Sequence, residues 1–213
     1  MLHNPRMGNI ILLNGSSSSG KTTLAEALQQ RLPEPYQHVS LDQFRDGLPM
    51  RYRGLNSPSG TPGAEGLNIV PVEMDGARVT EIRFGAHGEA VLEAMRRTVA
   101  LFSDKGLNVI VDDILFKPDY LHDYARVLPV ERTWLVGVTC KLEVVESREA
   151  SRVGRFPGTA NSHFDSVHAH GTSYDIEVDT SERGALAIAD EIIARLTTPP
   201  TALAHTRREL GLS

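Results

Sequence analysis

A short segment near the start of the chain combines glycines, small polar side chains and a lysine at a spacing suited to binding phosphate. Gly15 and Gly20 enclose four consecutive serines, and Lys21 and Thr22 follow directly. Glycines permit a tight turn with positive φ angles, and the small residues between them let backbone N–H groups approach an anion. The lysine can reach the β- and γ-phosphates of a nucleotide and stabilise the transferred group, and the threonine hydroxyl can bind Mg²⁺. This pattern, G-x-x-x-x-G-K-[ST], predicts a phosphate-binding loop.

The segments on either side of this loop strengthen the prediction. Residues 10–13 form a short apolar run, which is typical of a strand buried on both faces. Leu24, Leu28 and Leu32 recur every four residues, which indicates a helix that starts near Lys21 and adds the positive end of its dipole to the loop. A polar linker that matches the motif by chance would not need this order of strand, loop and helix. We expect the phosphates to be held by Gly15, Ser16, Ser17, Ser18, Ser19, Gly20, Lys21, Thr22 and Thr23.

Asp42 is the first candidate for proton transfer. It follows residues 38–41, which we expect to form the second strand. A carboxylate at the carboxyl edge of the sheet would lie near the terminal phosphate, where it could accept a proton from an attacking hydroxyl or orient that hydroxyl. Asp42 could equally be the N-cap of a helix that starts at Gln43, and the two roles are compatible.

Two further carboxylates, Asp112 and Asp113, end the apolar segment of residues 107–113. A carboxylate at a strand end that faces Thr22 can hold Mg²⁺ directly or through water. Successive side chains of a strand point to opposite faces, so only one of the pair can face the loop directly. We expect Thr22 and Asp112 to be the metal ligands, and Asp113 to contact the substrate or cap the following turn.

Three arginines, Arg148, Arg152 and Arg155, are spaced as one face of a helix that runs into a glycine-containing segment. In an enzyme that transfers phosphoryl groups, such arginines suit a lid that neutralises charge on the transferred group and excludes water. We expect Arg148 and Arg152 to take part in catalysis and Arg155 to bind the nucleotide. The alternative is a solvated basic face that pairs with Glu146 or Glu149.

Three histidines, His163, His168 and His170, lie within the same lid-like segment, which we place at residues 148–172. Their spacing matches no zinc signature, and no cysteine lies among them. A place on the surface or at the edge of the substrate site is therefore a better expectation than a metal site.

The elements that must position these residues alternate between strands and helices. Such alternation implies right-handed crossovers and a mostly parallel sheet that is covered by helices on both faces. We therefore predict an α/β fold of the P-loop type, with about five strands flanked by helices. The predicted strands are residues 10–13, 38–41, 107–113, 133–140 and 175–178.

One long segment interrupts this alternation. Residues 49–82 are rich in proline, glycine and asparagine, and Asp75-Gly76 lies between two strand-like segments, which indicates a β-hairpin. We expect this excursion to cover the acceptor. Residues 1–198 would then form a single phosphotransferase domain, followed by a loose tail at residues 199–213.

The composition favours an enzyme that acts on a small molecule. The chain of 213 residues has a formal net charge of −5, whereas a protein that neutralises nucleic-acid phosphates is usually basic. It has no N-K-x-D motif for guanine, and its single cysteine, Cys140, fits a reducing compartment. No apolar run approaches the roughly 20 residues of a membrane span, and the polar start is unlike a signal peptide. We expect a cytoplasmic enzyme without nucleic-acid or membrane partners, which acts alone or as a homo-oligomer.

Five segments together resemble the chloramphenicol phosphotransferase family. They are ILLNGSSSSGKTT, LPEPYQHVSLDQFRDGLP, NVIVDDILF, SREASRVGR and HGTSYDIEVDT, and the resemblance extends over residues 9–196. The first segment is shared by many kinases, whereas the second and the last are more particular. The resemblance implies transfer of a phosphoryl group from ATP to a primary hydroxyl of chloramphenicol or a related acceptor, and hence a role in antibiotic resistance.

Carried over by position, the resemblance implies that residues 15–22 bind ATP with Mg²⁺, that Asp42 is the catalytic base, and that the arginines of SREASRVGR bind phosphate in a lid. Residues 51–82 differ from the family in length and composition, so the acceptor is what the resemblance defines least. One alternative is a P-loop kinase of another hydroxylated metabolite, such as a sugar acid, a shikimate-like diol or a nucleoside. The other is a non-catalytic module that binds a nucleotide as a switch.

Overall fold

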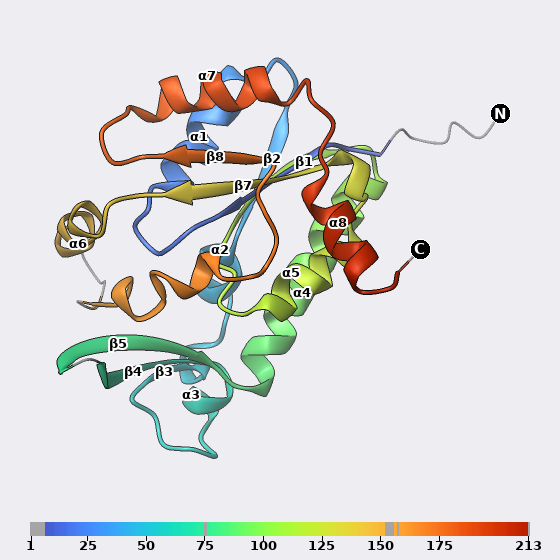
Figure 1. The fold of residues 1–213 in the computed structure, drawn as a ribbon. Coiled ribbons are helices and arrows are strands. Elements are labelled where there is room, and N and C mark those ends of the chain that lie inside the picture. The colour runs from blue at the N-terminus through green and yellow to red at the C-terminus, as the bar shows by residue number, and fades with distance from the viewer. Residues whose placement is uncertain (1–6, 75, 152–155, 157, 213) are drawn as a thin grey trace.

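The central feature of the fold is a five-stranded parallel sheet (Figure 1). The structure is a computed structural model that describes residues 7–74, 76–151, 156 and 158–212. The strands lie in the order β2-β6-β1-β7-β8, so β1 is central and pairs with β6 and β7. The predicted α/β fold is thereby confirmed. The strands are β1 (Ile10–Asn14), β2 (Tyr36–Ser40), β6 (Asn108–Asp113), β7 (Thr133–Thr139) and β8 (Ile176–Asp179).

The register of this sheet brings the carboxyl ends of three strands to one edge. Leu13 of β1 and Ser40 of β2 both lie beside Asp112 of β6, and Asn14 lies beside Asp113. Ligands of open parallel sheets bind at this edge, where loops leave the strands. The loop of residues 15–20 starts here, so the sheet sets the position of the candidate site.

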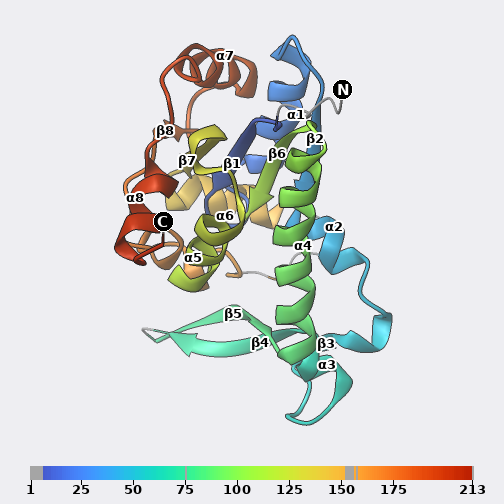
Figure 2. The ribbon, with the colours of Figure 1, turned by 90° about the vertical axis from the view of Figure 1, so that its right-hand side faces the viewer.

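Helices cover both faces of the sheet (Figures 1 and 2). Ile11 and Leu13 share an apolar core with α1 and α7, whereas Ile10 and Leu12 share a second core with α4, α5 and α8. This explains why the apolar run of β1 does not alternate with polar residues. The helices are α1 (Lys21–Arg31) and α7 (Ala185–Arg195) on the first face, and α4 (Ala86–Asp104), α5 (Pro118–Val127) and α8 (Ala202–Glu209) on the second.

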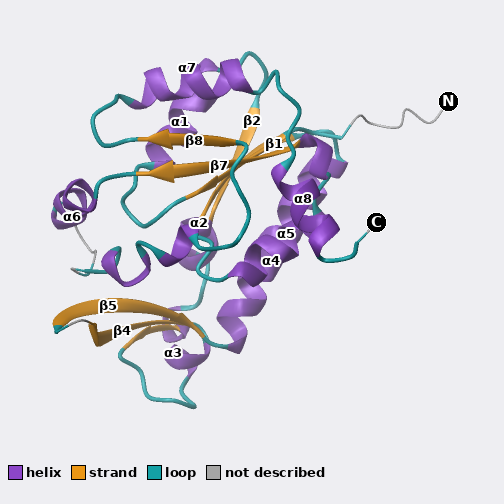
Figure 3. Cartoon of the chain, viewed as in Figure 1, coloured by secondary structure: helices purple, strands orange, loops and turns teal. Residues whose placement is uncertain are grey.

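A smaller, mixed sheet forms the excursion, and it lies apart from the main sheet with loops and α2 between them (Figure 3). The predicted hairpin is present, because β4 and β5 pair in antiparallel fashion from Leu67 with Phe84 outward. β3 pairs in parallel with β4 only as far as Ile69, before Pro71 is reached. The missing N–H of Pro71 therefore removes no hydrogen bond from the β3–β4 ladder. The elements are the 3₁₀ turn Met50–Tyr52, β3 (Arg53–Leu55), α3 (Pro62–Glu65), β4 (Leu67–Met74) and β5 (Ala77–Phe84).

Short helical elements complete the site side of the fold. α2 begins directly after β2, and α6 follows β7. Among the described residues, no helix is both long and apolar enough to cross a membrane. These elements are α2 (Leu41–Asp46) and α6 (Leu142–Ala150), with 3₁₀ turns at Val130–Arg132, Asn161–His163 and Ser166–His168.

The expectation of a loose tail from residue 199 onward is wrong. α8 packs against α5, with Leu203 fully buried in the shared core. Arg207 of α8 donates hydrogen bonds to the carbonyls of Ala125 and Leu128, at 2.8 and 3.0 Å. These carbonyls lie at the end of α5, where a helix lacks partners of its own. The two prolines at residues 199 and 200 therefore form a connection to a docked helix.

Candidate active site

The loop of residues 15–20 has the backbone of an anion-binding nest. Gly20 adopts a φ of 97°, and Ser18 has a positive φ of 60° although it is not a glycine. All four serines are buried. The N-cap of α1 is Gly20, which has no side chain to offer these groups, so the first N–H groups of this helix suit an anion.

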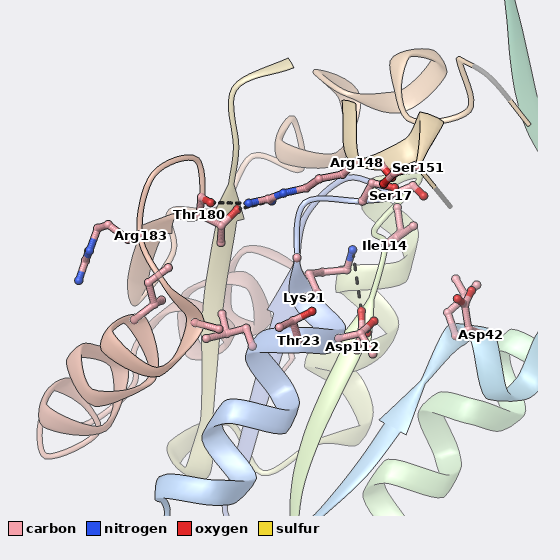
Figure 4. Close-up of a pocket in the computed structure, with 17 residues that line it drawn as sticks. Ser17, Lys21, Thr23, Asp42, Asp112, Ile114, Arg148, Ser151, Thr180 and Arg183 are labelled. Atoms are coloured by element: carbon pink, nitrogen blue, oxygen red, sulfur yellow. Dashed lines mark hydrogen bonds and ion pairs between the residues drawn. The ribbon is translucent and has the colours of Figure 1, made fainter. Parts of the chain in front are cut away.

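Lys21 and Thr22 both meet Asp112 at the end of β6. The hydroxyl of Thr22 donates to Oδ2 of Asp112 at 2.6 Å, and Nζ of Lys21 lies 3.8 Å from Oδ1 (Figure 4). Nζ of Lys21 also donates to the carbonyls of Gly15 and Ser16, at 2.9 Å each. The structure thus brings together the lysine, the hydroxyl and the carboxylate that the sequence predicts for phosphate and metal.

Asp113 faces away from this cluster. It is buried, accepts a hydrogen bond from the hydroxyl of Tyr124 at 2.8 Å, and accepts another from the backbone N–H of Ile114. Burial raises the pKa of Asp113 to about 6, although these hydrogen bonds oppose the rise. The expected contact with substrate is wrong, because alternation along β6 turns this side chain into the core, while its link to Ile114 matches the expected role in the following turn.

Asp42 lies in the first turn of α2, and it is not the N-cap of that helix. Ser40 is the N-cap, and it forms a reciprocal capping box with Gln43. Oδ1 of Asp42 pairs with Arg45 at 2.7 Å, and Arg45 also pairs with Asp46 at 2.9 Å. In Figure 4, Asp42 lies across Lys21 and Asp112 from Arg148.

Arg148 lies at the opposite end of the site. Its guanidinium donates to the carbonyl of Thr180 at 2.7 Å and to the hydroxyl of Thr180 at 3.2 Å. That hydroxyl in turn donates to the carbonyl of Ser19 at 2.6 Å. Glu149, a predicted partner, instead accepts hydrogen bonds from the backbone of the segment that follows α6. The other two predicted arginines, Arg152 and Arg155, lie outside the described residues.

Two adjoining cavities meet at Asp42. A cavity of about 400 Å³ is lined by the phosphate loop, Asp112, Arg148 and Arg183. A second cavity of about 620 Å³ lies between α2 and the smaller sheet. The residues that line both cavities are Ser17, Leu41, Asp42 and Ile114.

The histidines of the lid-like segment are more buried than expected. His163 and His170 are each 5% exposed, so a place on the surface is wrong for these two. Burial, followed by the charge of Lys21, lowers the pKa of His163 to about 3. Burial also lowers the pKa of His170, to about 4. His168 is half-buried, and its Nδ1 lies 2.7 Å from the hydroxyl of Tyr174.

Sequence reasoning missed Arg45, the site role of Thr180 and the contact of His163 with the loop. The capping box Ser40-x-x-Gln43 is a readable signal that places Arg45 one turn after Asp42. The contacts of Thr180 and His163 join segments far apart in the chain, so no local pattern predicts them.

A parallel sheet, a loop of this geometry and a paired threonine and aspartate are typical of P-loop nucleotide-binding proteins. Solved structures agree with this fold. The chain is similar to an APS kinase of Mycobacterium tuberculosis in complex with AMPPNP and APS, with a TM-score of 0.59, 18% identity, and coverage of 91% of this chain and 100% of that one. It is also similar to a gluconokinase of Sinorhizobium meliloti 1021, with a TM-score of 0.56, 19% identity, and coverage of 90% and 93%.

The chain belongs to the chloramphenicol phosphotransferase-like family, whose sequence profile matches residues 8–197. A Mycobacterium tuberculosis protein of strain H37Rv, described as a candidate O-phosphotransferase, is 32% identical over 200 residues. The similarity covers 94% of this chain and 87% of that protein. The chain is therefore a small-molecule kinase of this family.

Proposed function

We propose that the protein transfers the γ-phosphoryl group of ATP to a hydroxyl group of a small molecule, with Asp42 as the base. The observation that carries this proposal is the position of Asp42, which lines both cavities. A nucleotide with its phosphates on the loop would direct the terminal phosphate toward the junction. A hydroxyl in the second cavity would meet that phosphate beside Asp42. Its oxygen would then attack in line with the leaving oxygen, as phosphoryl transfer requires.

The first cavity suits a nucleoside triphosphate along its length. The loop amides and the N-terminus of α1 would bind the phosphates. Arg148, Thr180 and Arg183 line the end that lies away from Asp42 (Figure 4). With the nucleotide in this orientation, Arg148 would lie near the nucleoside. Among the cationic side chains of the described residues, Lys21 would then lie nearest to Asp112 and the terminal phosphates.

Thr22 and Asp112 would hold Mg²⁺. Their oxygens lie 2.6 Å apart, and hydroxyl and carboxylate oxygens are ligands that this cation prefers. When bound, the cation would neutralise charge on the phosphate oxygens. Lys21 and the loop would hold the phosphate, and Asp42 would orient the acceptor hydroxyl.

The second cavity favours an acceptor with an apolar body and few polar groups. Its arginines, Arg45 and Arg53, are already engaged by protein oxygens, namely the carboxylates of Asp42 and Asp46 and the carbonyls of Leu48 and Asp46. Chloramphenicol and related alcohols suit this description, and such a reaction would inactivate the drug. An anionic acceptor such as a sugar acid is the second candidate, because the same arginines could turn toward a carboxylate. The apolar lining is formed by Leu41, Leu55, Leu67, Ile69, Ile82, Ile114 and Phe156.

A mass-spectrometric screen tests this function directly. The protein is incubated with ATP, Mg²⁺ and hydroxylated compounds, chloramphenicol and gluconate included, and products that gain one phosphoryl group are sought. Asp42→Asn should lower kcat at least about a hundredfold, the usual contribution of a general base, and leave ATP affinity nearly unchanged. Asp46→Asn is the graded control, because Asp46 touches Arg45 without lying in the nucleotide cavity, and it should cost about fivefold or less. Full activity of Asp42→Asn would refute the proposed base.

A further inference from the structure

The backbone amide of Ser17 makes a hydrogen bond that the proposed reaction does not itself require. Its N–H donates to Nε2 of His163 over 3.1 Å, although the two residues lie far apart in the sequence. Both residues are about 5% exposed, so water has little access to this contact. A buried N–H in an active-site loop needs a partner, and here the partner comes from the segment after α6.

The peptide that carries this N–H also holds the catalytic lysine. Its carbonyl belongs to Ser16 and accepts a hydrogen bond from Nζ of Lys21 at 2.9 Å. The peptide is trans, so its N–H and C=O point in opposite directions. His163 and Lys21 therefore bind the two ends of one peptide dipole. Without an acceptor for the N–H, the peptide could rotate, and the lysine would lose a fixed partner.

The hydrogen bond defines the state of the histidine. Nε2 has to be unprotonated to accept, so the proton of the neutral ring is placed on Nδ1, which lies 3.3 Å from the hydroxyl of Ser162. Phe116 packs against the ring edge with 5.1 Å between ring centroids. Burial and the nearby Lys21 lower the pKa of His163, which supports the neutral form.

The segment that carries His163 also forms part of the acceptor cavity. Thr159 lines that cavity. On either side of it, the N–H groups of Gly158 and Ala160 donate to the buried carboxylate of Glu149, at 2.8 and 3.0 Å. Glu149 thus fixes the segment to α6, and His163 fixes the same segment to the phosphate loop.

We propose that His163 is a positioning residue for phosphoryl transfer, because as a hydrogen-bond acceptor it fixes the Ser16–Ser17 peptide and thereby Lys21. This inference rests on the proposed kinase function, since it assigns the effect to the lysine that acts on the transferred phosphate. It also explains why a histidine is buried beside a cation, where a neutral acceptor is tolerated and a second charge is not.

Two variants separate the hydrogen-bonding nitrogen of His163 from the bulk of its ring. His163→Leu keeps an apolar side chain without a hydrogen-bond acceptor, whereas His163→Gln offers Oε1 near the place of Nε2. The Leu variant should lower kcat about tenfold, as expected for a buried N–H that loses its partner, and the Gln variant should recover most of that loss. The KM for the phosphoryl-accepting substrate should change little in either variant. His170→Leu is the control, because His170 is equally buried but accepts from the N–H of Thr172, away from the loop.

Binding and spectroscopy give measurements that do not depend on turnover. His163→Leu should weaken AMPPNP about fivefold and ADP less, because the terminal phosphate depends most on Lys21. In the ¹⁵N-labelled wild-type protein, a scalar coupling across the hydrogen bond should join the amide nitrogen of Ser17 to Nε2 of His163. Both His163 variants should lack this coupling, and His170→Leu should retain it.

The outcomes are separable. Equal kcat for the wild type and His163→Leu, or no coupling in the wild type, would overturn the inference. Tighter AMPPNP binding by His163→Leu would also overturn it, because the histidine would then compete with phosphate for the amide. If the Leu variant failed to fold, the Gln variant and the wild-type coupling would still decide. If the wild type phosphorylated no acceptor, the kinase proposal would fail, while the binding and coupling measurements would still test whether His163 orders the loop.

Discussion

At the nucleotide end of the site, the loop that would hold the phosphates comes from one continuous segment, residues 15–23, whereas the walls of the acceptor end come from segments far apart in the chain. At the nucleotide end, backbone groups and short side chains are held by the end of β1 and the start of α1. At the acceptor end, the walls come from α2, the smaller sheet and the segment around Thr159. A site made of one local segment can keep its geometry while the walls opposite it change. This difference favours a common phosphate donor and variable acceptors within one fold.

Removal of the lysine should have the largest effect, and it tests the nucleotide end alone. Lys21→Met removes the charge near the terminal phosphate, so kcat should fall roughly a thousandfold, as for loss of a group that stabilises the transition state. Steady-state kinetics with the acceptor found in the screen measure this loss. Lys105→Met, at an exposed lysine after α4, is the control and should keep wild-type activity. A loss of less than about tenfold in Lys21→Met would assign the charge stabilisation to other groups.

The neighbouring carboxylates of β6 sharpen the comparison, because only Asp112 belongs to the nucleotide end. The pKa of Asp113 rises from 3.8 to about 6 on folding, so the folded state binds more protons between these pH values. The contribution of Asp113 to stability is therefore fully present below pH 3.8 and is lost as the pH rises through 6. Relative to the wild type, Asp113→Asn should gain up to about 3 kcal/mol of unfolding free energy over that range.

Urea unfolding of the wild type and Asp113→Asn at several pH values measures this difference, and other titrating groups cancel in the comparison. Asp112→Asn is the matched variant. It should lower activity, because Asp112 meets Thr22 and Lys21, whereas Asp113 lies in the core. A constant difference between Asp113→Asn and the wild type from pH 4 to pH 7 would mean that Asp113 keeps an ordinary pKa.

The two ends of the site also differ in how far the sequence predicts them. The phosphate loop and β1 are predictable because a local motif and a doubly buried strand leave clear patterns in adjacent residues. Asp112 differs from Asp113 in that it faces Thr22. The alternation of side chains along a strand indicates that only one of the two can do so, and the register of the sheet decides which one. At the acceptor wall, Asp75-Gly76 predicts the hairpin itself, but its place beside α2 depends on contacts between distant segments, as do the places of His163 and α8. Residues 156–172 also lack periodic apolar spacing. Tertiary packing, not local propensity, places these parts.

At the acceptor end, Arg45 links Asp42 to Asp46, and its removal should have a smaller effect. Arg45→Gln should lower kcat/KM for the acceptor about fivefold, because the pair is partly exposed and solvent already weakens it. The KM for ATP should not change, since Arg45 lines only the acceptor cavity. Arg97→Gln is the control, because Arg97 forms a comparable exposed pair with Glu93 on α4. An equal rise in both KM values would mean that the two ends are not independent.

The smallest expected effect comes from the apolar wall. Ile69 of β4 and Ile82 of β5 lie directly opposite each other and both line the acceptor cavity. Ile82→Val removes one methylene from this wall, so the acceptor KM should rise about threefold for an apolar alcohol, with the KM for ATP unchanged. Val70→Ala is the matched control on the opposite face of β4, because neighbouring side chains of a strand alternate. If Ile82→Val instead left an apolar acceptor unaffected and improved a sugar acid, the acceptor would bind against the arginines, and the second candidate for the substrate would replace the first.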